Sequence, residues 1–289
     1  MKKLTKILML ALVMCCAFVF TACGGGELDT EVKVDTGKEA DYVACTAENS
    51  LVSKVEAGEV VAPEEFSGLK LTLKANMDTN QGGMPKEVAI DMNLILTASL
   101  EEGEELTAAD IGMGLKGSIK MTTPLSKEDM EMNISAYLKE NVMYINYSMG
   151  EEEVKGKVTL EDMMGDADEA PEDFDISQIK EVLEGILASE DLVQKVIENG
   201  EDSTYQLELG TTKLYVIVKD NAFNKALITM EDVNVVDLIS QFVPEVGEMN
   251  IPEITLNELS VAFEFTDSAI NYPSFKGYQE ITDGLIPGM

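Results

Sequence analysis

The sequence predicts an α+β fold, in which a few helices cover one face of a curved, mostly antiparallel sheet. Three observations carry this prediction. Apolar and polar side chains alternate through most of the chain. Short turn sequences separate the alternating segments, as in an antiparallel meander. Residues 176–199 instead place apolar residues at helical spacing, and strand and helix do not alternate as they do in a doubly wound sheet.

Residues 1–26 begin with three lysines and an apolar run over residues 7–20, followed by Thr21, Ala22 and Cys23. This order resembles the signal of bacterial lipoproteins, which implies a signal peptide over residues 1–22 and acylation of Cys23. A simple signal peptide and a membrane span are the alternatives. The apolar run is shorter than the about 20 residues that a span requires.

Residues 23–37 are predicted to be a flexible tether, because three glycines precede a polar, acidic stretch without an apolar period. Residues 38–289 are predicted to form a single α+β domain. With Cys23 acylated, the protein would lie on the outer face of the bacterial cell membrane, held there by its lipid anchor.

The composition excludes several classes of function. The chain has 54 Asp and Glu residues, 21 basic residues that are all Lys, no His, and a net charge of −33. This charge disfavours nucleic acid and would hold the body of the protein away from an anionic bilayer, so Cys23 is the expected membrane contact. Without His or Arg, the chain lacks the usual acid–base and anion-clamping residues, and we expect no enzyme, cofactor or metal site.

The strands are predicted from alternation with apolar residues on one face. Ten segments qualify: 69–77, 88–100, 111–121, 130–136, 142–147, 154–160, 203–209, 213–218, 223–232 and 256–266. Turns are expected at residues 139–141, 150–152 and 220–221. The tail beyond Asp267 is predicted to be irregular.

Helices are expected in four places. Residues 38–55 have apolar residues four apart, although residues 42–46 could also be extended. The segments 176–187 and 189–199 each have an apolar stripe, and the second would end at Asn199 and Gly200. These two helices would cover the apolar face of the sheet. A short helix is also expected at residues 235–242.

One hairpin resembles a known superfamily. Ala136, Tyr137 and Leu138 precede a turn, and Met143 to Asn146 and Val154 to Lys157 follow it. This arrangement resembles the lipoprotein carrier LolA, the mycobacterial lipoproteins LppX and LprG, and uncharacterised Gram-positive lipoproteins. The resemblance implies a LolA-like fold, in which the sheet forms an incomplete barrel around helices, and acyl chains held between the two.

Several motifs suggest chemistry, but each lacks its required context. The GxGxxG pattern at residues 112–117 lies in a predicted strand, where glycine permits bending or close backbone approach instead. The SxxK spacings at residues 67–70 and 177–180 come without partner motifs. The acidic residues 161–175 do not match a calcium loop. Cys45 is interpreted as a buried small hydrophobe, since no His could activate it.

Six methionines at apolar-face positions are the candidate lining of a binding cavity: Met77, Met92, Met113, Met121, Met130 and Met132. Flexible thioethers suit an adaptable site for an acyl chain, and they equally suit an imperfect core. Two hypotheses follow. The first is a membrane-tethered module that binds a lipid or other hydrophobic ligand; the second is a cell-surface structural or protein-interaction domain whose core is filled.

Overall fold

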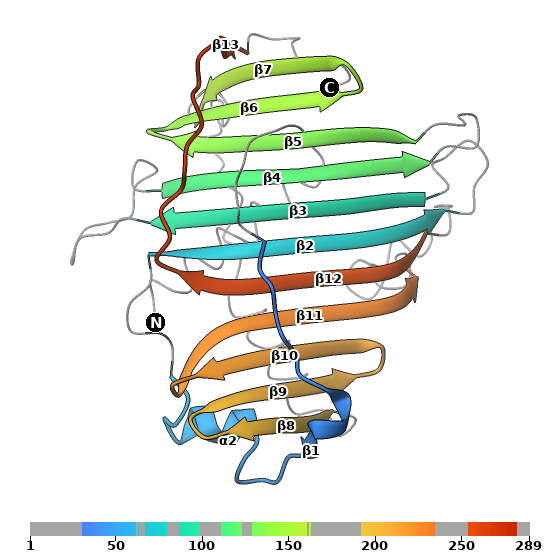
Figure 1. Cartoon of the computed structure of the whole chain (residues 1–289), viewed down its shortest axis with the longest axis vertical. Helices are drawn as coiled ribbons and strands as arrows, with labels where there is room; N and C mark the ends of the chain where they lie inside the picture. The colour runs from blue at the N-terminus through green and yellow to red at the C-terminus, as the bar shows by residue number, and fades with distance from the viewer. Residues whose placement is uncertain are drawn as a thin grey trace.

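The computed structural model describes residues 31–61, 63, 67–79, 87–98, 111–122, 129–160, 162, 192–234 and 254–281. In these residues the chain forms one 13-stranded sheet and two short helical segments (Figure 1). The helical segments are η1 (Glu39–Asp41) and α2 (Leu51–Glu56). The strands are β1 (Val43–Ala44), β2 (Gly68–Thr79), β3 (Glu87–Ala98), β4 (Ile111–Thr122), β5 (Met130–Lys139), β6 (Val142–Met149), β7 (Glu152–Thr159), β8 (Val193–Asn199), β9 (Asp202–Leu209), β10 (Thr212–Lys219), β11 (Ala222–Asn234), β12 (Ile254–Thr266) and β13 (Gln279–Glu280).

Two antiparallel meanders build the sheet. Strands β2 to β7 form the first, and β8 to β12 form the second. Strand β12 pairs with both β11 and β2, so it joins the two meanders into the order β1-β8-β9-β10-β11-β12-β2-β3-β4-β5-β6-β7-β13. The two-residue strands β1 and β13 are the outermost, and they pair with β8 and β7.

The prediction of an α+β fold with covering helices is wrong, because the described chain is almost entirely strand in one open sheet. The LolA-like architecture is not borne out for the same reason. The short helix expected at residues 235–242 lies outside the described residues. Of the two helices expected to cover the sheet, the first, residues 176–187, also lies outside them. The other, residues 189–199, contains strand β8.

The sequence of strand β8 resembles that of a helix for a physical reason. Its apolar residues lie on both faces of the sheet: Val196 is fully buried among Tyr205 and its neighbours, whereas Ile197 faces the other way, toward Gly37. Apolar residues at adjacent positions then look like a helical stripe. The Gly200 that was expected to stop the helix has φ +72° and instead makes the turn into β9.

Eight of the ten predicted segments lie wholly within strands. The segment 88–100 matches β3 up to Ala98, with residues 99–100 outside the described part, and the segment 154–160 matches β7 except for Leu160. The predicted turns at residues 139–141, 150–152 and 220–221 join these strands. At residues 140–141 and 220–221 both turn residues have positive φ, as type I′ hairpin turns require. The helix predicted over residues 38–55 is present only as η1 and α2, with the extended alternative realised in β1. Ser50 caps α2 by accepting a hydrogen bond from the Ser53 backbone N–H.

The sheet has an apolar face and a polar face. Leu69, Leu71, Leu94 and Leu115 lie on the apolar face, and Lys70, Thr72, Lys74 and their cross-strand neighbours lie on the polar face. Alternation along each strand, kept in register across the sheet, produces this division.

Two extended segments cross the polar face (Figure 1). The N-terminal strap, residues 31–42, starts beside β2, where the Val32 N–H donates to Thr72 Oγ1 at 2.7 Å, and runs toward β8. This stretch includes the described part of the expected tether, and there it packs along the sheet. The C-terminal strap, residues 267–281, runs from β12 to β7.

Aromatic rings hold the C-terminal strap. The Phe275 ring stacks on Tyr144 with centroids 3.8 Å apart, and Tyr272 and Tyr278 pack around the same rings. The Tyr272 hydroxyl donates to the Leu138 carbonyl at 3.0 Å. The tail is thus irregular as predicted over most of its length, yet docked on the sheet. None of the helices in the described part of the chain has the length and apolar character of a membrane span.

Candidate ligand-binding face

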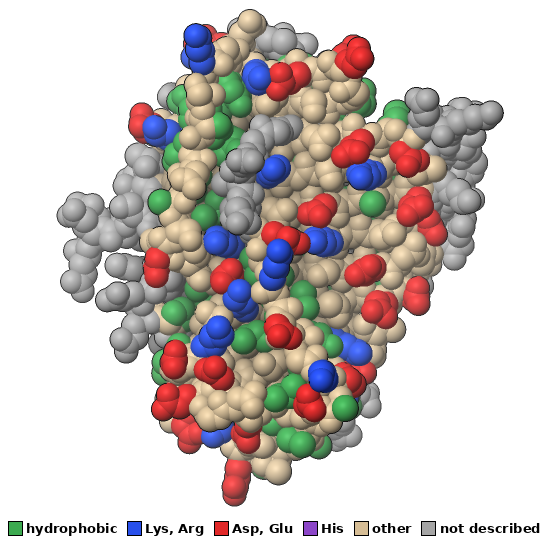
Figure 2. Space-filling view, viewed as in Figure 1, with side chains coloured by type: hydrophobic (Ala, Val, Ile, Leu, Met, Phe, Trp, Pro, Cys, Tyr) green, Lys and Arg blue, Asp and Glu red, His purple; other side chains and the backbone are tan. Residues whose placement is uncertain are grey.

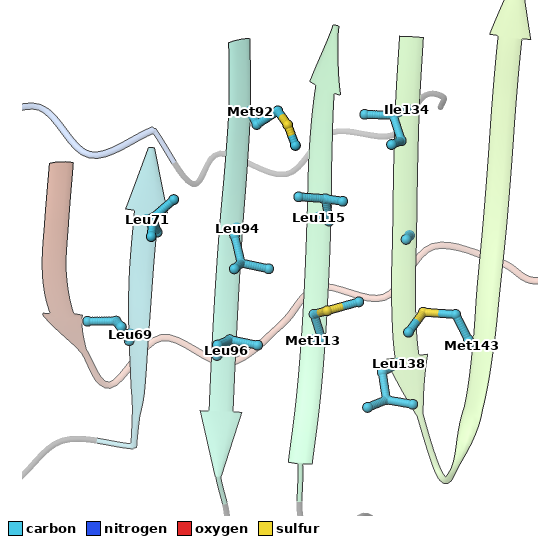
Figure 3. Packing of buried hydrophobic residues seen from close by; sticks show 11 residues of the cluster. Leu69, Leu71, Met92, Leu94, Leu96, Met113, Leu115, Ile134, Leu138 and Met143 are labelled. Atoms are coloured by element: carbon cyan, nitrogen blue, oxygen red, sulfur yellow. The ribbon is translucent and has the colours of Figure 1, made fainter. Parts of the chain in front are cut away.

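The apolar face consists of rows of side chains that run across neighbouring strands, because antiparallel pairing sets residues of one face opposite each other. The central part of one row is Leu69, Leu96, Met113, Leu138 and Met143. Its members are at most 2 % exposed. Figure 3 shows these side chains on the same side of the strands, beside the next row of Leu71, Leu94 and Leu115.

All six predicted methionines lie on this face. Met77, Met121 and Met130 share one row, in which Val88 stands between the first two. Met132 and Met92 lie in the next two rows, and Met113 lies two rows beyond Met92, with the row of Leu94 and Leu115 between them. The register therefore brings Met77, Met121 and Met130 into one row and separates Met113 from them by the length of the strands.

Exposure changes steadily along the apolar face. Met113 is completely buried and Met92 is 5 % exposed, whereas Met77, Met121 and Met132 are half-buried and Met130 is 39 % exposed. Met149, the cross-strand partner of Met132, is 46 % exposed. The methionines thus belong to two environments: a closed core at one end of the strands and a partly open, methionine-rich end at the other.

A glycine in β4 keeps the middle of this face tightly packed. Gly117 lies in register with Met92 and Ile134. A Cβ at Gly117 would lie 2.6 Å from the Asp91 carbonyl oxygen and 2.9 Å from Met92 Cγ. Gly117 belongs to the GxGxxG pattern. It allows the neighbouring strands to approach closely, which is one of the two roles predicted for glycine within this strand.

Gly112, the first glycine of that pattern, lies on the polar face of the sheet. A Cβ at Gly112 would lie 2.7 Å from the Tyr272 hydroxyl and 3.0 Å from Ile270 Cδ1. Gly112 therefore leaves room for the C-terminal strap to dock. The pattern lies within strand β4 and does not open a helix, which the dinucleotide-binding fingerprint requires.

The remaining sequence candidates divide between described and undescribed residues. Cys23, Ser177 and residues 163–175 lie outside the described part. Cys45 is half-buried against the cluster around Val196 and Tyr205, and burial, followed by the nearby Glu198 charge, raises the pKa of its thiol. A raised pKa keeps the thiol protonated and unreactive at neutral pH. Within the described ranges, no cluster of acidic or cysteine side chains could hold a metal ion.

Sequence reasoning missed the two straps and the residues that hold them. Two ion pairs hold the N-terminal strap: Glu31 with Lys74 at 2.7 Å, and Glu39 with Lys195 at 2.9 Å. The C-terminal strap is fixed by Phe275. The available signal was the spacing of Tyr272, Phe275 and Tyr278, three aromatic residues three apart in a tail without strand alternation.

Comparison with known proteins gives little further constraint. No protein-family model matches the chain, and no curated protein matches it. A crystal structure from Nitrosomonas europaea, provisionally assigned as AttH, is similar with a TM-score of 0.25 and 10 % identity over 79 % of this chain. The match spans 59 % of that protein's length. Likeness at this level carries no conclusion about function.

Proposed function

We propose that this protein is a lipid-anchored, non-enzymatic protein of the outer face of the bacterial cell membrane. It binds an acyl chain or another hydrophobic ligand at the methionine-rich end of its apolar face. The observation that carries the proposal is the exposure gradient, from fully buried Met113 to Met130 at 39 %. The anchor rests on the signal sequence that ends at Cys23.

The methionine-rich end has properties that suit such a ligand. Its side chains come from adjacent strands, so Met77, Met121 and Met130 present flexible thioethers along one line. Unbranched, polarisable side chains adapt to a chain of variable shape. Every lysine of the described strands lies on the opposite face, so no ammonium group of a described strand interrupts this apolar surface.

A second function is favoured by a different observation. The rows through Leu69 and Leu71 are almost fully buried, with Met113 and Met143 at 0 % exposure. A protein that uses this face only as a filled core would be a structural or protein-interaction domain at the cell surface. The two functions differ in whether the partly open end holds a foreign molecule.

The test uses the chain from residue 24 to residue 289, made without the anchor. Native mass spectrometry and lipid extraction should find a co-purifying hydrophobic molecule, and a fluorescent fatty acid should bind. Met130→Glu should weaken that binding about tenfold or more, because a carboxylate in an apolar site costs at least 1.4 kcal/mol. Ser118→Glu, on the polar face of β4, is the matched control and should bind normally.

The outcomes separate the two functions. A chain that carries no molecule and does not bind the fatty acid would leave the filled-core domain as the function, and equal binding with and without Met130→Glu would place the ligand away from the methionine-rich end. Thermal unfolding of both variants checks that the fold is kept. The anchor is tested separately: Cys23→Ser in the full chain should abolish incorporation of labelled palmitate and release the protein from the membrane.

A further inference from the structure

The described chain begins at the centre of the polar face. Glu31 forms an ion pair with Lys74 of β2, and Val32 is buried beside Thr72 of the same strand. Strand β2 has six strands on each side of it in the 13-stranded order. The described chain therefore starts over the middle of the polar face and not at a lateral edge.

The chain between this point and the proposed anchor is short. Cys23 lies eight positions before Glu31, and a fully extended chain covers at most about 3.5 Å per position, which gives about 28 Å. Strands lie about 4.8 Å apart, so the nearest lateral edge of the sheet is about 29 Å from β2. The anchor segment thus starts on the polar side of the sheet, and it reaches a lateral edge only at full extension.

Of the two faces of the described sheet, the polar face is the one that an anionic surface repels less. All eleven lysines of the described strands lie on it: Lys70, Lys74, Lys116, Lys120, Lys139, Lys155, Lys157, Lys195, Lys213, Lys219 and Lys225. Ten acidic residues of the same strands share the face: Asp78, Glu87, Asp91, Glu131, Glu153, Asp202, Glu208, Glu231, Glu258 and Glu264.

The charges of these strand residues nearly cancel, although the whole chain carries −33. Figure 2 shows the lysines gathered across the middle of this face, between acidic groups. An anionic bilayer repels net negative charge and attracts lysines close to its surface. A nearly balanced face with projecting ammonium groups can approach phospholipid headgroups that the rest of the protein avoids.

We infer that the polar face of the sheet rests against the anionic headgroups of the membrane that holds the lipid anchor, with the apolar face and α2 directed away. This inference rests on the anchor proposed above. It revises the expectation that Cys23 is the membrane contact, since Lys70, Lys116 and their neighbours add a second one. The ligand-binding end then opens away from the bilayer.

The test uses the full lipidated protein in vesicles of phosphatidylglycerol and phosphatidylcholine whose headgroups carry a nitroxide quencher. A single fluorescent label is placed, in a Cys45→Ser background, at Ser118→Cys or at Glu56→Cys. Ser118 lines a groove of about 310 Å³ on the polar face, and Glu56 is exposed on α2, which packs on the apolar face. Because these positions differ by at least one layer of about 10 Å, quenching should be at least about twofold stronger at Ser118.

Two further arms make the outcome decisive. Lys116→Gln together with Lys70→Gln should reduce the difference between the labels on anionic vesicles and leave it unchanged on purely phosphatidylcholine vesicles; Lys54→Gln on α2 is the control. Equal quenching at the two labels, on protein that floats with the vesicles, would overturn the orientation. Failure to float would instead count against the lipid anchor and hence the proposed function.

Discussion

Gly117 shows how one missing side chain sets the packing of the apolar face. It lies within a strand, between Met92 and Ile134, where β-branched residues are usually favoured. We expect Gly117→Val to destabilise the protein by about 1–3 kcal/mol, because the new carbons must displace Met92 and press against the Asp91 carbonyl. Urea unfolding, followed by circular dichroism, measures the change.

The control is Ser118→Val, the next residue along β4, whose side chain faces the polar groove. It should change the free energy of unfolding by less than about 0.5 kcal/mol, as surface substitutions usually do. A Gly117→Val variant as stable as this control would mean that Met92 and the neighbouring strand can move aside for the new side chain at little cost.

At the scale of single elements, the C-terminal strap depends on one ring. Phe275 contacts Tyr144, Tyr137, Tyr272 and Tyr278 with centroid separations of 3.8 to 6.2 Å. We expect Phe275→Ala to cost about 1–2 kcal/mol, less than for a fully buried ring because Phe275 is half-exposed. Amide hydrogen exchange should rise in residues 267–281 and along β7, while β2 to β4 stay protected.

Lys276→Ala is the matched control for the strap, since Lys276 is an exposed neighbour of Phe275. Its exchange pattern should match that of the unmodified protein. Uniform exchange changes over the whole sheet after Phe275→Ala would show that the strap is part of the global folding unit and does not open by itself.

The N-terminal strap is attached through charge and should respond to pH. Hydrogen bonding to Lys74, followed by its charge, lowers the pKa of Glu31, and hydrogen bonding to Lys195 lowers the pKa of Glu39. A carboxylate whose pKa is lowered on folding stabilises the protein at pH values above its unfolded pKa of 4.5. That stabilisation is lost as the pH falls through the lowered folded pKa.

We therefore expect the double variant Glu31→Gln, Glu39→Gln to have a lower Tm than the unmodified protein at about pH 7, and the Tm difference to narrow as the pH falls below 4.5. Differential scanning calorimetry at several pH values measures it. Glu48→Gln, at an exposed acid before α2, is the comparison and should follow the unmodified protein. A Tm difference that is constant with pH would mean that the strap is not held by these charges.

The success of sequence reasoning also differs between elements. Strands such as β2 and β3 were predictable, because one face is buried and alternation follows directly. Strand β8 was not predictable, because the N-terminal strap covers its second face and the residue there, Ile197, is apolar as well. The straps have no periodicity, so a local pattern could not reveal where Val32 or Phe275 docks. The methionines were placed on the correct face, but their exposure depends on the register between strands.

For the whole molecule, the pairing of β2 with β12 was beyond any local pattern. This pairing spans residues 68–79 and 254–266, and it alone joins the two meanders of the sheet. Neighbouring strands in sequence usually pair, which predicts the hairpins but not this contact. The loss of β12 would expose β2 and β11, two long strands with unpaired backbone groups, to other chains.

We expect Ala262→Pro, in the middle of β12, to show this dependence. Ala262 is 3 % exposed and lies opposite both Leu227 of β11 and Thr72 of β2. Proline there removes a ladder hydrogen bond and cannot fit a central strand, which costs about 3 kcal/mol or more. Size-exclusion chromatography should find aggregates in place of monomer, whereas Ser268→Pro, just beyond the strand, should remain monomeric. A monomeric Ala262→Pro variant with an unchanged Tm would mean that the two meanders are stable without β12 between them.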